Sequence, residues 1–200
     1  SAIENNKPLI ILDRPNPNGF YVDGPVLDTA YKSFVGMQPI PMVYGMTMGE
    51  YAKMLIGEKW AKAAATATSL PNITIIKNKN YTHKSKYVLP VKPSPNLGTM
   101  ASVYWYGSNC LFEGTVLSEG RGTDFPFAIF GHPSLPKTLY TFTPTSRDGA
   151  KEPKLKDQTC YGWNLAGTDK EVLQKVDDKI QLSYLLEAYK LFPEKEKFFI

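Results

Sequence analysis

The stretch KPLIILDRPNP, residues 7–17, decides how the first part of the chain folds. The five residues from Pro8 to Leu12 show no alternation with polar residues, and Asp13 and a proline-rich turn follow them. An uninterrupted apolar run of this length is typical of a strand that is buried on both faces of a parallel sheet. Such a strand needs neighbouring strands and crossover helices. We therefore expect it to end an α/β domain whose earlier part lies outside this chain.

A helix is expected further along this part of the chain. In PIPMVYGMTMGEYAKMLIGEKW, residues 39–60, Thr47 and Glu50 have the spacing of a capping box, so the helix should begin at Thr47. Tyr51, Met54 and Leu55 then fall on one helical face. The small-residue run AKAAATATSLP, residues 61–71, ends at a proline and is the candidate linker. We place the border between the first domain, residues 1–68, and a C-terminal α/β domain, residues 69–200, within this run.

The second domain should mix strands and helices. Strands are expected in ITIIKNK (73–79), FAIFGHP (127–133) and TLYTFTPTS (138–146), each followed by turn signals. Asn96 is the expected N-cap of a segment that runs through TMASVYWYGSNCLFEG (99–114). Residues 169–191 have apolar positions at near-helical spacing and predict one long helix with a solvent-facing charged side.

Composition excludes several classes of protein. The chain has 200 residues, 42% of them hydrophobic, and its net charge of +4 comes from 23 basic and 19 acidic residues without a basic block, which argues against nucleic-acid binding. No apolar run reaches the roughly 18 to 20 residues of a transmembrane segment. Cys110 and Cys160 lie too far apart in the sequence to suggest a metal cluster. They are either two buried thiols or, in an oxidising compartment, one disulfide.

The segment CLFEGTVLSEGRGTDFPF, residues 110–127, is the first candidate site. Its glycines do not have the spacing of a dinucleotide loop, and a strand is expected after them. Neither His83 nor His132 lies in a recognised nucleophile motif. Glu113, however, lies near Arg121, whose flanking glycines permit close approach of a ligand. Two interpretations stay open: the carboxylates and Arg121 contact a ligand, or Glu113 and Arg121 pair across a tight turn.

The end of the first strand is the second candidate site. Asp13, Arg14 and Asn16 follow LIIL directly, and ligands of open α/β sheets bind beyond the carboxyl ends of the strands. Prolines on both sides of Asn16 stiffen this loop. The alternative is that the loop is only a rigid, capped turn.

Several of these motifs, in this order, resemble those of a known bacterial family. LDRPNPNG (12–19), VDGP (22–25), PIPMVYGMTMGE (39–50), PSPNL (93–97), CLFEGT (110–115) and GRGTDFPF (120–127) are similar to motifs of the YbbC-like family, now called NamZ. CYGWNL (160–165) resembles a seventh motif. The resemblance covers most of the chain.

The resemblance implies a glycoside hydrolase, an exo-β-N-acetylmuramidase that releases terminal N-acetylmuramic acid from the non-reducing ends of peptidoglycan fragments, without a cofactor or metal. It implies the end of a Rossmann-like domain followed by a smaller α/β C-terminal domain. It also implies export to the periplasm or cell surface. The family's catalytic glutamate belongs to a Pro-Glu-His-Gly motif, which is absent from this sequence. We therefore expect a fragment that is inactive by itself; the alternative is a non-catalytic glycan-binding or interaction module.

The resemblance also suggests roles for individual residues. The lactyl carboxylate of N-acetylmuramic acid calls for a fixed cation, for which Arg121 is the first choice and Arg14 the second. Glu113 is the fallback acid or base if the missing glutamate is not used. The complete set of residues expected to bind substrate is Asp13, Arg14, Asn16, Tyr44, Asn96, Arg121 and Thr123. His83 lies where many relatives have a tryptophan and an arginine.

Overall fold

The computed structural model describes residues 2, 5, 7–61 and 72–200. The chain forms two compact units, Ser1–Tyr87 and Val88–Ile200. The expected border between residues 68 and 69, and all of the candidate linker except Ala61, lie outside the described residues. The first unit extends as far as Tyr87 because a strand after the linker returns to pair with the first strand of the chain.

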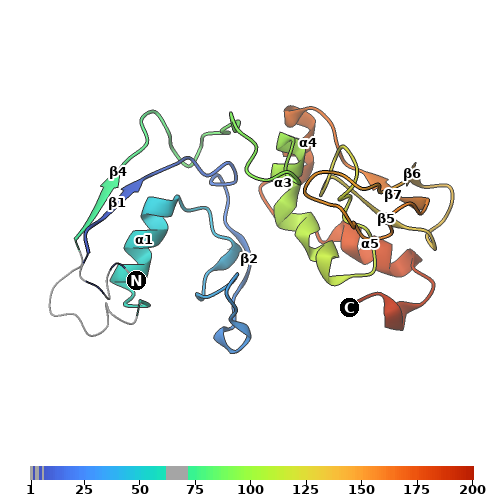
Figure 1. Cartoon of the computed structure of the whole chain (residues 1–200), viewed down its shortest axis with the longest axis horizontal. Coiled ribbons are helices and arrows are strands. Elements are labelled where there is room, and N and C mark those ends of the chain that lie inside the picture. Colours follow the sequence, from blue (N-terminus) through green and yellow to red (C-terminus); the bar gives the residue numbers. More distant parts are fainter. Residues whose placement is uncertain (1, 3–4, 6, 62–71) are drawn as a thin grey trace. The chain divides into compact units, whose positions relative to one another are not determined.

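A short parallel sheet lies in the first unit. Strand β1 (Leu9–Leu12) pairs in parallel with β4 (Ile73–Ile76), and helix α1 (Met48–Gly57) contacts β1 (Figure 1). The parallel strand and the strand in ITIIKNK are thus confirmed. The expectation that both faces of β1 are buried is wrong for this chain, because Ile10 is 66% exposed and Leu12 is 72% exposed. Among the described residues β1 has β4 as its strand neighbour and lacks a second one.

A hairpin separates β1 from α1 in the sequence. Strands β2 (Asp23–Val26) and β3 (Pro41–Val43) pair in antiparallel fashion, and a 3-10 helix, η1 (Thr29–Tyr31), lies between them (Figure 1). Helix α1 then begins after Thr47 with the predicted capping box. Thr47 accepts a hydrogen bond from the backbone of Glu50, whose carboxylate accepts one from the backbone of Thr47.

The second unit is built on an antiparallel sheet with the strand order β5, β7, β6 (Figure 1). The strands are β5 (Ile129–His132), β6 (Tyr140–Phe142) and β7 (Cys160–Asn164). The first two confirm the expected strands. The ring of Phe130 on β5 stacks between Phe112 and Trp163, with ring centroids 4.2 and 5.1 Å away. This aromatic stack forms a large part of the core of the unit.

Helix α3 (Met100–Asn109) crosses this core and brings the fully buried Trp105 into it. The helix begins after Thr99, which accepts a hydrogen bond from the backbone of Ser102, so the expected N-cap at Asn96 is wrong. A 3-10 helix, η2 (Cys110–Gly114), continues from α3. The residues GRGTDFPF then form turns that lead into the expected strand, β5, and Phe127 has a φ of 62°.

Residues 169–191 form two helices and not the single one expected. Helix α4 (Asp169–Val176) ends where Asp177 and Asp178 adopt left-handed backbone angles, with φ of 52° and 50°. Aspartate tolerates this conformation better than most residues. Helix α5 (Ser183–Leu191) follows.

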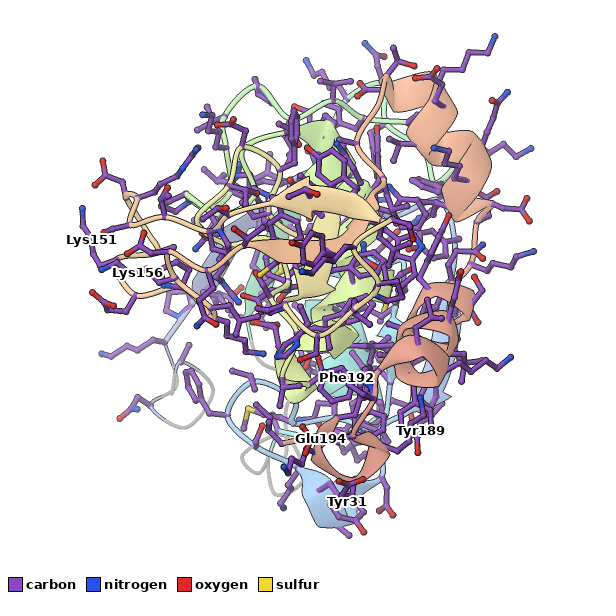
Figure 2. The ribbon with its side chains drawn as sticks, turned by 90° about the vertical axis from the view of Figure 1, so that its right-hand side faces the viewer. Tyr31, Lys151, Lys156, Tyr189, Phe192 and Glu194 are labelled. Carbon is purple, nitrogen blue, oxygen red and sulfur yellow. The ribbon has the colours of Figure 1, made fainter. Side chains whose placement is uncertain are left out.

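The C-terminal segment closes the second unit. Helix α5 carries Tyr189, and Phe192 directly follows the helix (Figure 2). Both rings pack against the fully buried Phe198, which follows the 3-10 helix η3 (Lys195–Lys197). Lys151 and Lys156 extend outward from the loop before β7 (Figure 2).

Candidate functional site

Asp13 lies directly after β1 and connects this strand end to the beginning of α1. Its Oδ2 atom accepts a hydrogen bond of 2.7 Å from the hydroxyl of Thr47, and its Oδ1 atom accepts bonds from the backbone of Gly49 at 2.9 Å and of Arg14 at 3.0 Å. Burial acts to raise the pKa of Asp13, but these hydrogen bonds outweigh it and hold the pKa below its ordinary value. Asp13 is therefore an ionised anchor of the loop.

Asn16 is fixed by hydrogen bonds on both sides of its amide. Its Nδ2 atom donates to the carbonyl oxygen of Met46 at 3.0 Å, and its Oδ1 atom accepts from the backbone of Asn18 at 2.9 Å. The hydroxyl of Tyr81 donates to the backbone oxygen of Asn16 at 3.1 Å. The rigid, capped turn considered as the alternative to a ligand site is thus present, and Asn16 does not line the pocket that Asp13 and Tyr81 line.

Glu50 and His83 form a second connection at the same end of α1. The Nε2 atom of His83 lies 3.0 Å from Oε1 of Glu50, and its Nδ1 atom lies 2.9 Å from the carbonyl oxygen of Gly19. Chiefly because of the hydrogen bond to Glu50, and also because of the one to Gly19, the pKa of His83 is raised above its ordinary value. Two acceptors on the two ring nitrogens favour the doubly protonated imidazolium.

Asp13, Glu50 and Tyr81 lie on a pocket of about 140 Å³ at the carboxyl ends of β1 and β4. Most of its lining is polar or charged: Asp13, Thr47, Glu50, Lys53, Lys77 and Asn78. Of the other expected substrate-binding residues of this unit, Arg14 has an exposed side chain and Tyr44 packs its ring against Tyr51 at 6.2 Å. Neither Arg14 nor Tyr44 lines the pocket, whereas Asp13 does.

Arg121, in the second unit, lies in a cluster of ion pairs. Its Nη1 atom is 2.7 Å from Oε1 of Glu119, and its Nη2 atom is 2.7 Å from Oε1 of Glu113. Its guanidinium also lies over the ring of Phe127, 4.8 Å from the centroid. Glu119 is almost fully buried, and its other oxygen lies 3.5 Å from Nζ of Lys154. The pairing of Glu113 with Arg121 across a turn is therefore present, with Glu119 as a second carboxylate partner.

A second pocket, of about 290 Å³, brings together residues from three segments of the second unit. Its polar lining includes Lys92, Asn96, Thr123, Asp124, Arg147 and Asp148. Asn96 donates to the carbonyl oxygen of Gly149 at 2.9 Å, and Thr123 donates to that of Gly120 at 2.6 Å. Asn96 and Thr123 thus lie on one pocket, and their predicted role in substrate binding stays a prediction. Arg121 and Glu113 do not line it.

Comparison with known proteins agrees with the family motifs. A model for the N-terminal domain of exo-β-N-acetylmuramidase NamZ matches residues 1–101, and the corresponding C-terminal model matches residues 104–199. The chain belongs to the NamZ family. The peptidoglycan β-N-acetylmuramidase NamZ of Bacillus subtilis (strain 168) is 36% identical over 220 residues, which cover 99% of this chain and 49% of the relative.

Two crystal structures of DUF1343 family proteins from Bacteroides fragilis NCTC 9343 share the α/β fold of this NamZ-family chain. One superposes with a TM-score of 0.91 at 48% identity, covering 99% of this chain and 54% of the other. The second has a TM-score of 0.68 at 25% identity, covering 98% of this chain and 56% of the other. The chain therefore spans about half the length of the NamZ relatives that it matches.

The described part of this NamZ-family chain contains no cluster of three or more histidine, cysteine or acidic side chains that could hold a metal ion. Cys110 and Cys160 are both free thiols, and burial raises their pKa values to about 11 and about 12. Neither is a ready nucleophile at neutral pH. No described helix is both long and apolar enough to cross a membrane.

The sequence analysis missed Lys53, Lys77 and Asn78. Lys77 and Asn78 follow β4 directly, so the strand-end rule that pointed to Asp13 would also have pointed to them. Lys53 lies in the second turn of α1 and is brought to the pocket only by the packing of α1 beside β1.

Proposed function

We propose that this chain contributes the glycan-binding surface of an exo-β-N-acetylmuramidase that acts on peptidoglycan. Membership of the NamZ family, through both of its domain models, carries the proposal. The name of the Bacillus relative supports the same reaction class. The polar pocket at the carboxyl ends of β1 and β4 supports sugar binding, because ligands of α/β sheets bind at this edge.

The proposal assigns different tasks to different parts of the protein. Hydrolysis of a glycoside needs a protonated acid and a second group that attacks or activates water. We assign the acid to the glutamate of the Pro-Glu-His-Gly motif, which this sequence lacks. Glu113, the fallback, is paired with Arg121, and this contact gives it a structural role of its own.

The test compares two polypeptides: the product of the whole reading frame that contains this sequence, and the 200-residue chain by itself. Both are assayed for hydrolysis of a chromogenic β-N-acetylmuramide. We expect turnover by the first and none by the second. Absence of turnover by the whole product, with the Bacillus relative active under the same conditions, would refute the proposed activity.

A non-catalytic glycan-binding role is the second candidate. The two polar pockets formed by the described residues support it. Titration of muramic-acid-containing fragments into both polypeptides separates the two functions. Binding without turnover in both would favour this second role.

We also propose that the first unit is part of a Rossmann-like domain and that the protein works in the periplasm or at the cell surface. The parallel pair of β1 and β4 with α1 beside it supports the first point. Peptidoglycan lies outside the cytoplasmic membrane, which supports the second. Fractionation of cells that produce the whole protein tests its location, and recovery from the cytoplasm alone would count against export.

A further inference from the structure

Three side chains that line the pocket of the first unit carry donors without a protein acceptor among the described residues. The Nδ2 atom of Asn78 is buried and makes no hydrogen bond. Lys53 and Lys77 line the same pocket, and neither forms an ion pair with any residue of the described ranges. A buried donor that stays unsatisfied costs about 1–3 kcal/mol, so the amide of Asn78 favours a partner that brings an acceptor into the pocket.

The two carboxylates that line this pocket already have partners. Both carboxylate oxygens of Asp13 accept hydrogen bonds from Thr47, Gly49 or Arg14. One oxygen of Glu50 accepts from the backbone of Thr47, and the other contacts His83. The carboxylates of Asp13 and Glu50 are thus held by their own partners, whereas the exposed ammonium groups of Lys53 and Lys77 are left to meet a ligand that brings acceptors and negative charge.

Arg121 differs from Lys53 and Lys77 because its guanidinium already has carboxylate partners. Both terminal nitrogens of Arg121 already contact carboxylates at 2.7 Å, and one of these belongs to the almost fully buried Glu119. A ligand carboxylate at Arg121 would have to displace one of them. At Lys53 and Lys77 no carboxylate of the described residues has to move.

We propose that Lys53, Lys77 and Asn78 form a carboxylate-binding site at the carboxyl end of β4. The identity of the ligand rests on the proposed muramidase function: the site takes the lactyl carboxylate of N-acetylmuramic acid, which N-acetylglucosamine lacks. The two lysines supply charge, and the amide of Asn78 supplies a fixed donor. Selection between the two sugars then resides in the first unit and not at Arg121.

The test measures binding of methyl β-N-acetylmuramide and methyl β-N-acetylglucosaminide to the whole protein that contains this chain by isothermal titration calorimetry. Wild type should prefer the muramide by at least about tenfold, since a hydrogen bond to a charged group contributes about 1.5–3 kcal/mol. The double variant K53M/K77M should lose this preference. Asn78→Asp, which places a negative charge in the site, should also lose it. Lys79→Met is the matched control, because Lys79 is exposed, close in sequence and not on the pocket.

Two results would overturn the proposal. If K53M/K77M keeps the wild-type preference, another group selects the carboxylate, although the protein can still be a muramidase. If wild type binds both sugars equally or neither, the site does not recognise a carboxylate. The chromogenic assay on the whole protein judges the muramidase function separately, so failure of the site and failure of the function are distinguished.

Discussion

Replacing Arg121 with methionine tests whether the Glu119 cluster holds the second unit together. Glu119 is 2% exposed, and its close cationic partner is Arg121, with Lys154 farther away at 3.5 Å. Removing one partner of a buried ion pair costs about 3–5 kcal/mol, because the remaining charge is left without compensation. Lys154 stays near the carboxylate, so we expect R121M to lower the free energy of unfolding by about 3 kcal/mol, at the lower end of this range.

Two further variants separate the effect of the buried ion pair, Arg121 with Glu119, from that of the more exposed pair, Arg121 with Glu113. The Glu113 side chain is 38% exposed, so Glu113→Gln should cost no more than about 1 kcal/mol. In the double variant R121M/E119L both charges are gone and apolar groups take their place, which should restore much of the stability that R121M loses. The double variant should therefore be more stable than R121M.

Urea unfolding followed by tryptophan fluorescence measures these differences. Trp105 and Trp163 lie in the second unit and Trp60 in the first, so a Trp60→Phe background makes the signal report the second unit. If R121M unfolds within about 1 kcal/mol of its parent, Glu119 does not depend on Arg121. Arg121 would then again be available to a ligand.

Three other predictions concern caps, histidines and thiols. Thr47→Ala should destabilise the first unit by about 1–2 kcal/mol in thermal unfolding, whereas Thr47→Ser should stay near wild type, because Thr47 both caps α1 and donates to a carboxylate. In an NMR titration the pKa of His83 should lie above 6.5 and that of the half-buried His132 below it, and equal values would refute both expectations. His83 therefore stabilises the fold below about pH 6.5 and loses this effect as the pH rises through its folded pKa. His132 stabilises the fold above about pH 6.5 and loses this effect as the pH falls through its folded pKa. At pH 7 the buried Cys160 should react with a thiol reagent only after unfolding, and the partly exposed Cys110, whose pKa is raised, should react slowly; fast labelling of Cys160 in the native chain would contradict its burial.

Local signals in the sequence predicted local structure well. Thr47 and Glu50 form the expected capping box because both partners lie within one helical turn. The apolar run before Asp13 forms the expected parallel strand, and Asp13 lies on a pocket at its end. In each case the residues that decide the structure are neighbours in the chain.

Contacts between distant residues were not predictable from the sequence. Arg121 and Glu113 are eight residues apart and could be paired from the sequence, but Lys154 reaches the same cluster from more than thirty positions away. The break after α4 was missed because Asp177 and Asp178 fit the polar face of a helix equally well. Their left-handed backbone angles turn the chain between α4 and α5. No short sequence pattern predicts this turn.

Lys154 makes the end of η2 depend on a distant loop of the second unit. Its ammonium group donates to the carbonyl oxygens of Phe112, Glu113 and Thr115, at 3.2, 2.9 and 2.8 Å, across about forty residues of chain. The end of η2 therefore gains its cationic cap only after a long loop has closed, and long-range contacts of this kind slow folding. The helix end and the loop that carries Lys154 must form together, so a single proteolytic cut in that loop would also release the helix end from its cap.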